Sequence, residues 1–267
     1  MSGLLEIDRL AVPLETYLHD LGDVFTVIRG HDSGCTSYGV DDGTGRWFVK
    51  VAHGEAVAQL NSAVRLHARV QHPAIVALRS SFAVCGGRAV VYPWVAGEVL
   101  NDPCLPGALR PAHPQSALSR FRRLPTETIL TVVDRIVDAH LAVTRRGFVA
   151  VDFYDGCVLH DFPTGRTHLV DLDMYRPGPY VLQADRQYGS TRFMAPEEFR
   201  RGSVIDERTT VFTLGRTARV LLGEAGQWRG STSLELVVER ATREQQAERF
   251  ADVESFANAW FGAARSS

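Results

Sequence analysis

The segment Gly45-Arg46-Trp47-Phe48-Val49-Lys50-Val51-Ala52 carries the clearest structural signal in the chain. Its β-branched and aromatic residues are typical of a strand, and the Asp- and Gly-rich residues 41–45 before it are typical of a tight turn. Lys50 is also the single lysine of the chain, since every other one of its 29 Lys and Arg residues is arginine. An ammonium group retained among so many guanidinium groups indicates a position that needs a compact point charge.

The residues around this strand predict a small β-rich domain over residues 23–97, with residues 1–22 as a helical extension before it. Its predicted elements, in chain order, are strands at 24–29, 38–40 and 47–51, a helix over 57–70, and strands at 75–82 and 88–94. The first three strands make a meander because turn residues separate them. The helix follows from apolar residues at mostly three- and four-residue spacing.

The rest of the chain, residues 98–267, predicts a larger and mainly helical domain. Residues 101–115 are rich in proline and irregular, which is typical of a linker. The predicted elements after it are an amphipathic helix that begins near Pro125 and ends at Gly147, a hairpin of residues 158–162 and 167–172, and helices within 194–265. We therefore expect an α+β fold with two lobes.

Composition excludes several classes of protein. The net charge of -2 offers no electrostatic basis for binding nucleic acid or an anionic membrane. The four cysteines form no C-x-x-C motif, so neither a disulfide framework nor a zinc site is predicted. Acidic residues interrupt the apolar N-terminal segment, and no apolar segment approaches the roughly 20 residues that a membrane span needs. We expect a soluble, cytoplasmic protein.

Several short motifs become informative because of their order along the chain. They are Phe48-Val49-Lys50-Val51-Ala52, His72-Pro73, Gly147-Phe148-Val149-Ala150-Val151-Asp152, Leu169-Val170-Asp171-Leu172-Asp173, Gly189-Ser190-Thr191-Arg192-Phe193-Met194-Ala195-Pro196-Glu197 and Val211-Phe212-Thr213-Leu214-Gly215. This order resembles the eukaryotic-like serine/threonine protein kinase family, as a divergent bacterial member, over roughly residues 24–260. The Met-Ala-Pro-Glu segment with the helix after it is the most specific part of the resemblance.

The resemblance implies a bilobal protein-kinase-like fold and a phosphotransferase that uses ATP with Mg²⁺ or Mn²⁺. Lys50 would contact the α- and β-phosphates, and Asp171 would hold the metal ion. Asp152 would orient the acceptor hydroxyl and take its proton. Glu197 and Arg249 would form an ion pair that anchors the segment after the activation loop.

The resemblance also implies which residues contact the nucleotide. Only a loose Gly-x-x-x-Gly spacing remains of the glycine-rich loop, at Gly30 and Gly34. Ser37 would add a hydroxyl, as in the phosphate loops of small-molecule kinases. Tyr92 falls at the gatekeeper position and Trp94 in the hinge, which predicts a tight adenine pocket.

The catalytic loop departs from the family at three positions. Val151 replaces the arginine that reads a phosphorylated activation loop, so we expect no control through that phosphorylation. Tyr154 replaces a lysine, and Cys157 replaces the metal-binding asparagine. Because a thiol is a poor ligand for Mg²⁺, another oxygen must complete the metal site.

Asp173 is the first candidate for this oxygen. It follows Asp171 by two residues at a predicted strand end, so both carboxylates would point to one side. Asp155 is an alternative. A third interpretation is that Asp173 only caps a turn and Cys157 only packs.

Two further family positions differ. The glutamate expected to pair with Lys50 is missing near residues 61–63, and Glu55 is the nearest acid. Thr210 replaces the aspartate that braces the catalytic loop.

Three functions stay open on these grounds. The first is an active kinase of protein Ser or Thr hydroxyls, which the retained Lys50, Asp152 and Asp171 favour. The second is a small-molecule kinase of the antibiotic-modifying type, which the unusual phosphate loop favours. The third is a pseudokinase that acts as a binding module, which the lost motif residues favour.

Overall fold

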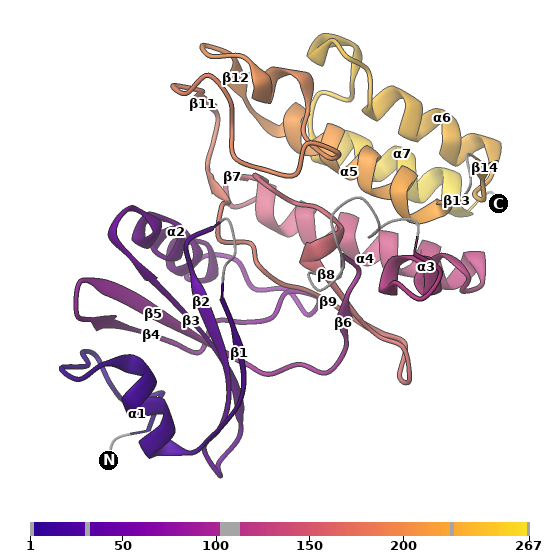
Figure 1. Cartoon of the computed structure of the whole chain (residues 1–267). Helices are drawn as coiled ribbons and strands as arrows, with labels where there is room; N and C mark the ends of the chain where they lie inside the picture. The colour runs from indigo at the N-terminus through magenta and orange to yellow at the C-terminus, as the bar shows by residue number, and fades with distance from the viewer. Residues whose placement is uncertain (1–2, 30–32, 102–112, 225–226, 266–267) are drawn as a thin grey trace. The chain divides into compact units, whose positions relative to one another are not determined.

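The computed structural model describes residues 3–29, 33–101, 113–224 and 227–265 (Figure 1). The chain forms two compact units. Unit 1 consists of Met1–Gln71 with Val76–Ala96, and unit 2 consists of His72–Ile75 with Gly97–Ser267. The chain passes into unit 2 after Ala96, next to the boundary that we predicted at residue 97.

Unit 1 is built on a five-stranded antiparallel sheet in the order β1-β2-β3-β5-β4. Its elements are α1 (Leu14–Leu21), β1 (Asp23–Ile28), β2 (Thr36–Asp41), β3 (Arg46–His53), α2 (Val57–His67), β4 (Ser80–Val84) and β5 (Gly87–Pro93). Asp42 sets the turn between β2 and β3, because its carboxylate accepts hydrogen bonds from the backbone amides of Thr44 and Gly45. The predicted meander is therefore present.

The two helices of unit 1 cover opposite faces of this sheet (Figure 1). One face, with Val49 and Val51 of β3, packs against Leu18 of α1. The other face, with Ala52 of β3, packs against Leu60 of α2. Alternation along a strand puts Lys50 on the same face as Ala52, toward α2. Residues 14–21 thus belong to the core of unit 1 and do not stand as a separate extension.

Unit 2 is mainly helical, as predicted. Its helices are α3 (Ala117–Arg122), α4 (Thr126–Thr144), α5 (Glu207–Leu222), α6 (Thr232–Ala241) and α7 (Val253–Arg265). Its strands are β6 (Glu98–Val99), β7 (Phe148–Val149), β8 (Val158–Asp161), β9 (Arg166–Leu169), β10 (Arg176–Pro177), β11 (Tyr180–Val181), β12 (Val204–Ile205), β13 (Gly223–Glu224) and β14 (Gln227–Trp228). Helix α4 packs against α5 and α7, and the β8–β9 hairpin pairs with β6.

Several predicted elements agree with the structure and two differ. The mixed α+β class, helix α4 and the hairpin are confirmed. The strand predicted at 75–82 begins only at Ser80, because Ile75 forms a bridge with Leu169 of unit 2 instead. The second hairpin strand ends at Leu169, so residues 170–172 are not part of it. Most of the predicted linker, residues 102–112, lies outside the described residues.

Among the described residues, no helix combines the length and the apolar character that crossing a membrane requires.

Candidate functional site

Lys50 lies in the middle of the unit 1 sheet. It is directly opposite Ser37 of β2 and Val90 of β5 in the strand register. Residues that are opposite each other in an antiparallel pair have their side chains on one face, so Lys50 and Ser37 are neighbours toward α2. Lys50 is buried, at 8% exposure. A buried ammonium in a strand centre is not the solvated surface lysine that is usual in proteins.

Two other residues that we predicted at the nucleotide, Gly34 and Tyr92, lie in unit 1. Gly34 has a φ of 70°, a left-handed conformation that favours glycine, just before β2. Gly30 lies outside the described residues. The Tyr92 ring packs edge-on against His67 of α2, with 5.4 Å between ring centroids. Burial lowers the pKa of His67 to about 4, so its ring is neutral at pH 7.

Trp94 belongs to an aromatic cluster with Phe25 and Phe48. The centroids of Trp94 and Phe25 are 4.8 Å apart, and the guanidinium of Arg46 lies 4.1 Å from the Phe25 centroid. A Cβ at Gly39 would come within 2.4 Å of the Phe25 ring, so this ring covers the backbone of Gly39, two residues after Ser37. The rings of this cluster are perpendicular or tilted to one another, and the contact of Trp94 with adenine stays a prediction.

Helix α2 has no acid on the face toward Lys50. Leu60, Ala63 and Leu66 fill its buried side. Glu55, the nearest acid in sequence, is exposed in the 3-10 turn before the helix. The side-chain amide of Gln59 instead donates a hydrogen bond to the carbonyl of Ser33, at 3.4 Å, which ties the helix to the predicted phosphate loop.

In unit 2, Asp152 and Asp171 have an unusual backbone conformation. Their φ angles are 56° and 58°, and they are the two non-glycine residues with positive φ in the part of the chain that the structure describes. Aspartate tolerates this left-handed region better than most residues, but the conformation still costs on the order of 1–3 kcal/mol. Such strain persists where the surrounding structure enforces it, and it concentrates at functional sites.

Hydrogen bonds from distant residues hold the loop that contains Asp152. The backbone amide of Ser190 donates to the Asp152 carboxylate at 3.0 Å. The amide of Ala150 donates to the hydroxyl of Thr210, at 3.1 Å, and Thr210 is fully buried at the start of α5. Thr210 therefore braces this loop through its hydroxyl.

Cys157 joins the backbone at the two aspartates. Its thiol donates to the carbonyl of Asp152 at 3.5 Å and lies 3.8 Å from that of Asp171. Burial raises the pKa of this thiol, and the negative charges of Asp171 and Asp152 raise it further. A neutral thiol does not bind Mg²⁺, so the expectation that Cys157 is no ligand has a structural reason.

Asp155, the alternative metal ligand that we considered, has a cationic partner within the chain. Its carboxylate is 1% exposed and accepts two hydrogen bonds from the guanidinium of Arg192, at 2.9 and 2.8 Å. Both oxygens are thus directed to a cation that the chain itself supplies. The pair also fastens residues 189–193 to the loop of Asp152 without a phosphate group.

The geometric reason for a metal site at Asp171 and Asp173 is wrong. Strand alternation cannot orient the two carboxylates, because β9 ends at Leu169 and Asp171 is left-handed. Asp171 is exposed, whereas Asp173 is 2% exposed. Among the described residues, no group of three or more His, Cys, Asp or Glu side chains is arranged to hold a metal ion. Metal binding at Asp171 and Asp173 stays a prediction.

A buried polar pair lies beneath the Asp152 loop, and the sequence did not point to it. The Tyr175 hydroxyl and Nε2 of His140 are 2.7 Å apart, and Nδ1 of His140 lies 2.7 Å from the carbonyl of Ile136. Burial lowers the pKa of His140 to about 4. The neutral ring must donate from Nδ1 to the carbonyl, so Nε2 accepts from Tyr175. The His140 ring also packs on Phe153, which follows Asp152.

The ion pair predicted between Glu197 and Arg249 is present. The guanidinium donates to both carboxylate oxygens at 2.8 and 2.9 Å, and both side chains are buried. Thr209 of α5 donates a further hydrogen bond to Glu197. Through these contacts the pair connects residues 195–199 with the N-terminal end of α5. The structural role that we expected for Glu197 and Arg249 agrees with this.

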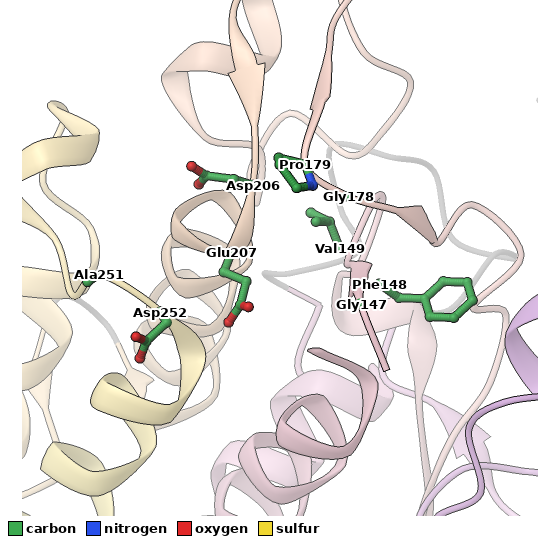
Figure 2. A pocket seen from close by; sticks show the side chains of 9 residues that line it. All are labelled: Gly147, Phe148, Val149, Gly178, Pro179, Asp206, Glu207, Ala251 and Asp252. Carbon is green, nitrogen blue, oxygen red and sulfur yellow. The ribbon is translucent and has the colours of Figure 1, made fainter. Parts of the chain in front are cut away.

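A pocket of about 220 Å³ lies elsewhere in unit 2 (Figure 2). Residues of β7 and the N-terminal ends of α5 and α7 line it, but Asp152 and Asp171 do not. Asp206, Glu207 and Asp252 border it, and each accepts a hydrogen bond from a backbone amide at or near a helix start. These carboxylates act as helix caps.

Comparison of the chain with known protein-family models and with curated proteins gave no match. Its function must therefore be inferred from the residues and contacts described above.

Proposed function

We propose that the chain is an ATP-dependent phosphotransferase that acts on a Ser or Thr hydroxyl of a protein. The observation that supports this most is the pair of left-handed aspartates, Asp152 and Asp171, whose backbone carbonyls converge on the buried thiol of Cys157. The strained backbone at these two aspartates is costly, and a catalytic role would explain why the cost is retained.

Asp152 would be the residue that handles the proton. Its carboxylate is partly exposed, and the Ser190 amide holds one oxygen. The other oxygen would accept a hydrogen bond from the acceptor hydroxyl, orient it, and take its proton as the new P–O bond forms. The buried His140 and Tyr175 below would keep this loop rigid.

Lys50 would supply positive charge to the triphosphate. Its ammonium can approach phosphate oxygens as a point charge, and the neighbouring Ser37 hydroxyl can donate to the same group. Asp171 fits a metal ion because it is exposed and carries a carboxylate, whereas the Cys157 thiol does not fit. Mg²⁺ held at Asp171 would offset the negative charge of the phosphates.

A second candidate function is a binding module without phosphoryl transfer. The specific observation in its favour is that Cys157 is a neutral, buried donor at the place where the family has a metal-binding amide. Helix α2 also presents no acid beside Lys50. Such a protein would keep its fold and its partner surface without turnover.

The experiment that separates these functions is incubation of the full chain with γ-labelled ATP and Mg²⁺ or Mn²⁺, with and without added protein and small-molecule acceptors. Label on protein, lost in Asp152→Asn, supports the proposal. Label only on a small acceptor would replace it with a small-molecule kinase. If the folded wild-type chain, checked by a cooperative thermal unfolding transition, transfers no phosphate with either metal, the binding module is the function that remains. Asp161→Asn is the matched control, because Asp161 is a carboxylate at the far end of β8.

A further inference from the structure

Arg192 contacts the loop of Asp152 through Asp155, and two arginines of α5, Arg216 and Arg219, are its electrostatic neighbours. Arg216 and Arg219 are one turn apart in α5, and Arg192 belongs to the segment that crosses this helix. Nε of Arg216 donates to the backbone carbonyl of Arg192 at 3.0 Å. Arg192 is two residues after Ser190, whose amide binds the Asp152 carboxylate. We call Arg192, Arg216 and Arg219 the arginine cluster.

The charges of this cluster are only partly balanced. Arg192 is paired with Asp155. Arg219 has Glu235 at 3.9 Å, a long contact in which both side chains are 36% exposed. Arg216 has no acid within 4.0 Å among the described residues, and its hydrogen bond goes to a neutral carbonyl. Burial lowers the pKa of Arg216, and the charges of Arg219 and Arg192 lower it further.

A half-buried guanidinium next to two others is an unfavourable arrangement unless an anion joins it. The planar guanidinium donates several hydrogen bonds in a fork that matches a carboxylate or a phosphate. Arg192 lies in the segment whose Ser190 amide binds the predicted catalytic base, and Arg216 is hydrogen-bonded to that segment, so an anion at the cluster would belong to the substrate itself.

We propose that the arginine cluster binds a negatively charged group of the acceptor, so that the preferred acceptor is a Ser or Thr within an acidic peptide. This inference rests on the proposed function only in taking the bound peptide to be the phosphate acceptor. The binding itself does not depend on turnover. The shared chemistry is a carboxylate or phosphate group, which either a glutamate or an already phosphorylated residue of the peptide could carry.

The test measures binding by fluorescence anisotropy with the full chain and no nucleotide. The probes are labelled peptides with one serine flanked by glutamates, by glutamines, by lysines or by phosphoserines. We expect the glutamate or phosphoserine peptide to bind at least about tenfold more tightly than the glutamine peptide, and the lysine peptide most weakly. Binding should also weaken as ionic strength rises, because exposed charges are screened.

Variants locate the binding site. Arg216→Gln and Arg219→Gln should each weaken binding of the acidic peptide by about fivefold, the usual range for one partly exposed ion pair. Arg166→Gln is the matched control, because it removes the same charge from an exposed position of the β8–β9 hairpin in the same unit. If Arg216→Gln unfolds, Arg219→Gln is the variant that tests the site, since Arg219 donates no hydrogen bond to a backbone carbonyl among the residues that the structure describes.

The outcomes separate this inference from the proposed function. Equal binding of acidic and neutral peptides, or unchanged binding in both cluster variants, would overturn the inference even if phosphate is transferred. Tight binding of the acidic peptide that the cluster variants weaken would support the inference even if no phosphate is transferred, in which case the proposed function fails alone.

Discussion

Replacing Arg249 by methionine should destabilise unit 2 severely. The guanidinium makes two hydrogen bonds to Glu197 and three more to the backbone carbonyls of Arg208, Arg243 and Glu244. The side chains of Arg249 and Glu197 are 0% and 7% exposed, so water cannot solvate either charge. Arg249→Met would leave a buried carboxylate with only neutral donors and three carbonyls without this donor.

Removal of one partner from a buried ion pair typically costs about 3–5 kcal/mol. That is a large part of the roughly 5–15 kcal/mol by which a domain is stable. The double variant Glu197→Gln/Arg249→Met removes both charges, so its loss should be smaller than the sum of the two single losses. This difference measures the coupling between the two side chains.

Urea denaturation followed by far-ultraviolet circular dichroism measures these losses, because most of the described helices belong to unit 2. Arg240→Met is the control, since Arg240 is an exposed arginine of the same unit that stacks on Phe250. A loss below about 1 kcal/mol in Arg249→Met, or additive losses in the double variant, would refute the view that this pair is a buried charge couple.

Three further predictions concern the candidate site and pH. Lys50→Met and Lys50→Arg should both keep the fold but lower phosphoryl transfer by about 10²-fold or more, because a guanidinium cannot reproduce the point contact; near-normal turnover of Lys50→Arg would contradict this. Asp171→Asn should raise the Mg²⁺ concentration for half-maximal activity by about tenfold or more, and Asp173→Asn should raise it less, because Asp171 is the exposed carboxylate; equal effects in an activity titration would show that both bind the metal. Because the pKa of His140 is lowered to about 4, the unfolded chain takes up a proton below its ordinary value of 6.5 while the folded chain does not. Its contribution to stability is therefore complete above pH 6.5 and is lost toward pH 4 at about 1.4 kcal/mol per pH unit, and His140→Gln should reduce that slope in urea titrations.

The elements of the fold were predictable where the signal is local. The turn at Asp42 and the alternation along residues 47–51 specify β3, and the apolar spacing within residues 126–144 specifies α4. These patterns work because turn chemistry and side-chain periodicity act within a few residues. The strand predicted at residue 75 began too early because Ile75 pairs with Leu169, almost a hundred residues away.

The candidate site was predictable in its residues but not in its contacts. The order of the motifs pointed to Lys50, Asp152 and Asp171. It did not show that Asp155 pairs with Arg192, so Asp155 was considered as a metal ligand. Nor did it show that β9 ends before Asp171, which removed the reason for pairing Asp173 with it.

The sequence by itself determined where β3, α2 and α4 lie, and it marked Lys50 as an unusual cation. Only the tertiary structure decided that Cys157 joins the carbonyls of Asp152 and Asp171, and that Thr210 braces Ala150 from sixty residues away. The physical reason is that a long-range contact of a single polar side chain produces no periodic pattern in the sequence and involves no neighbouring residue. Its meaning depends on which distant backbone groups folding brings within hydrogen-bond reach, and burial then decides whether it acts as a ligand, a cap or a brace.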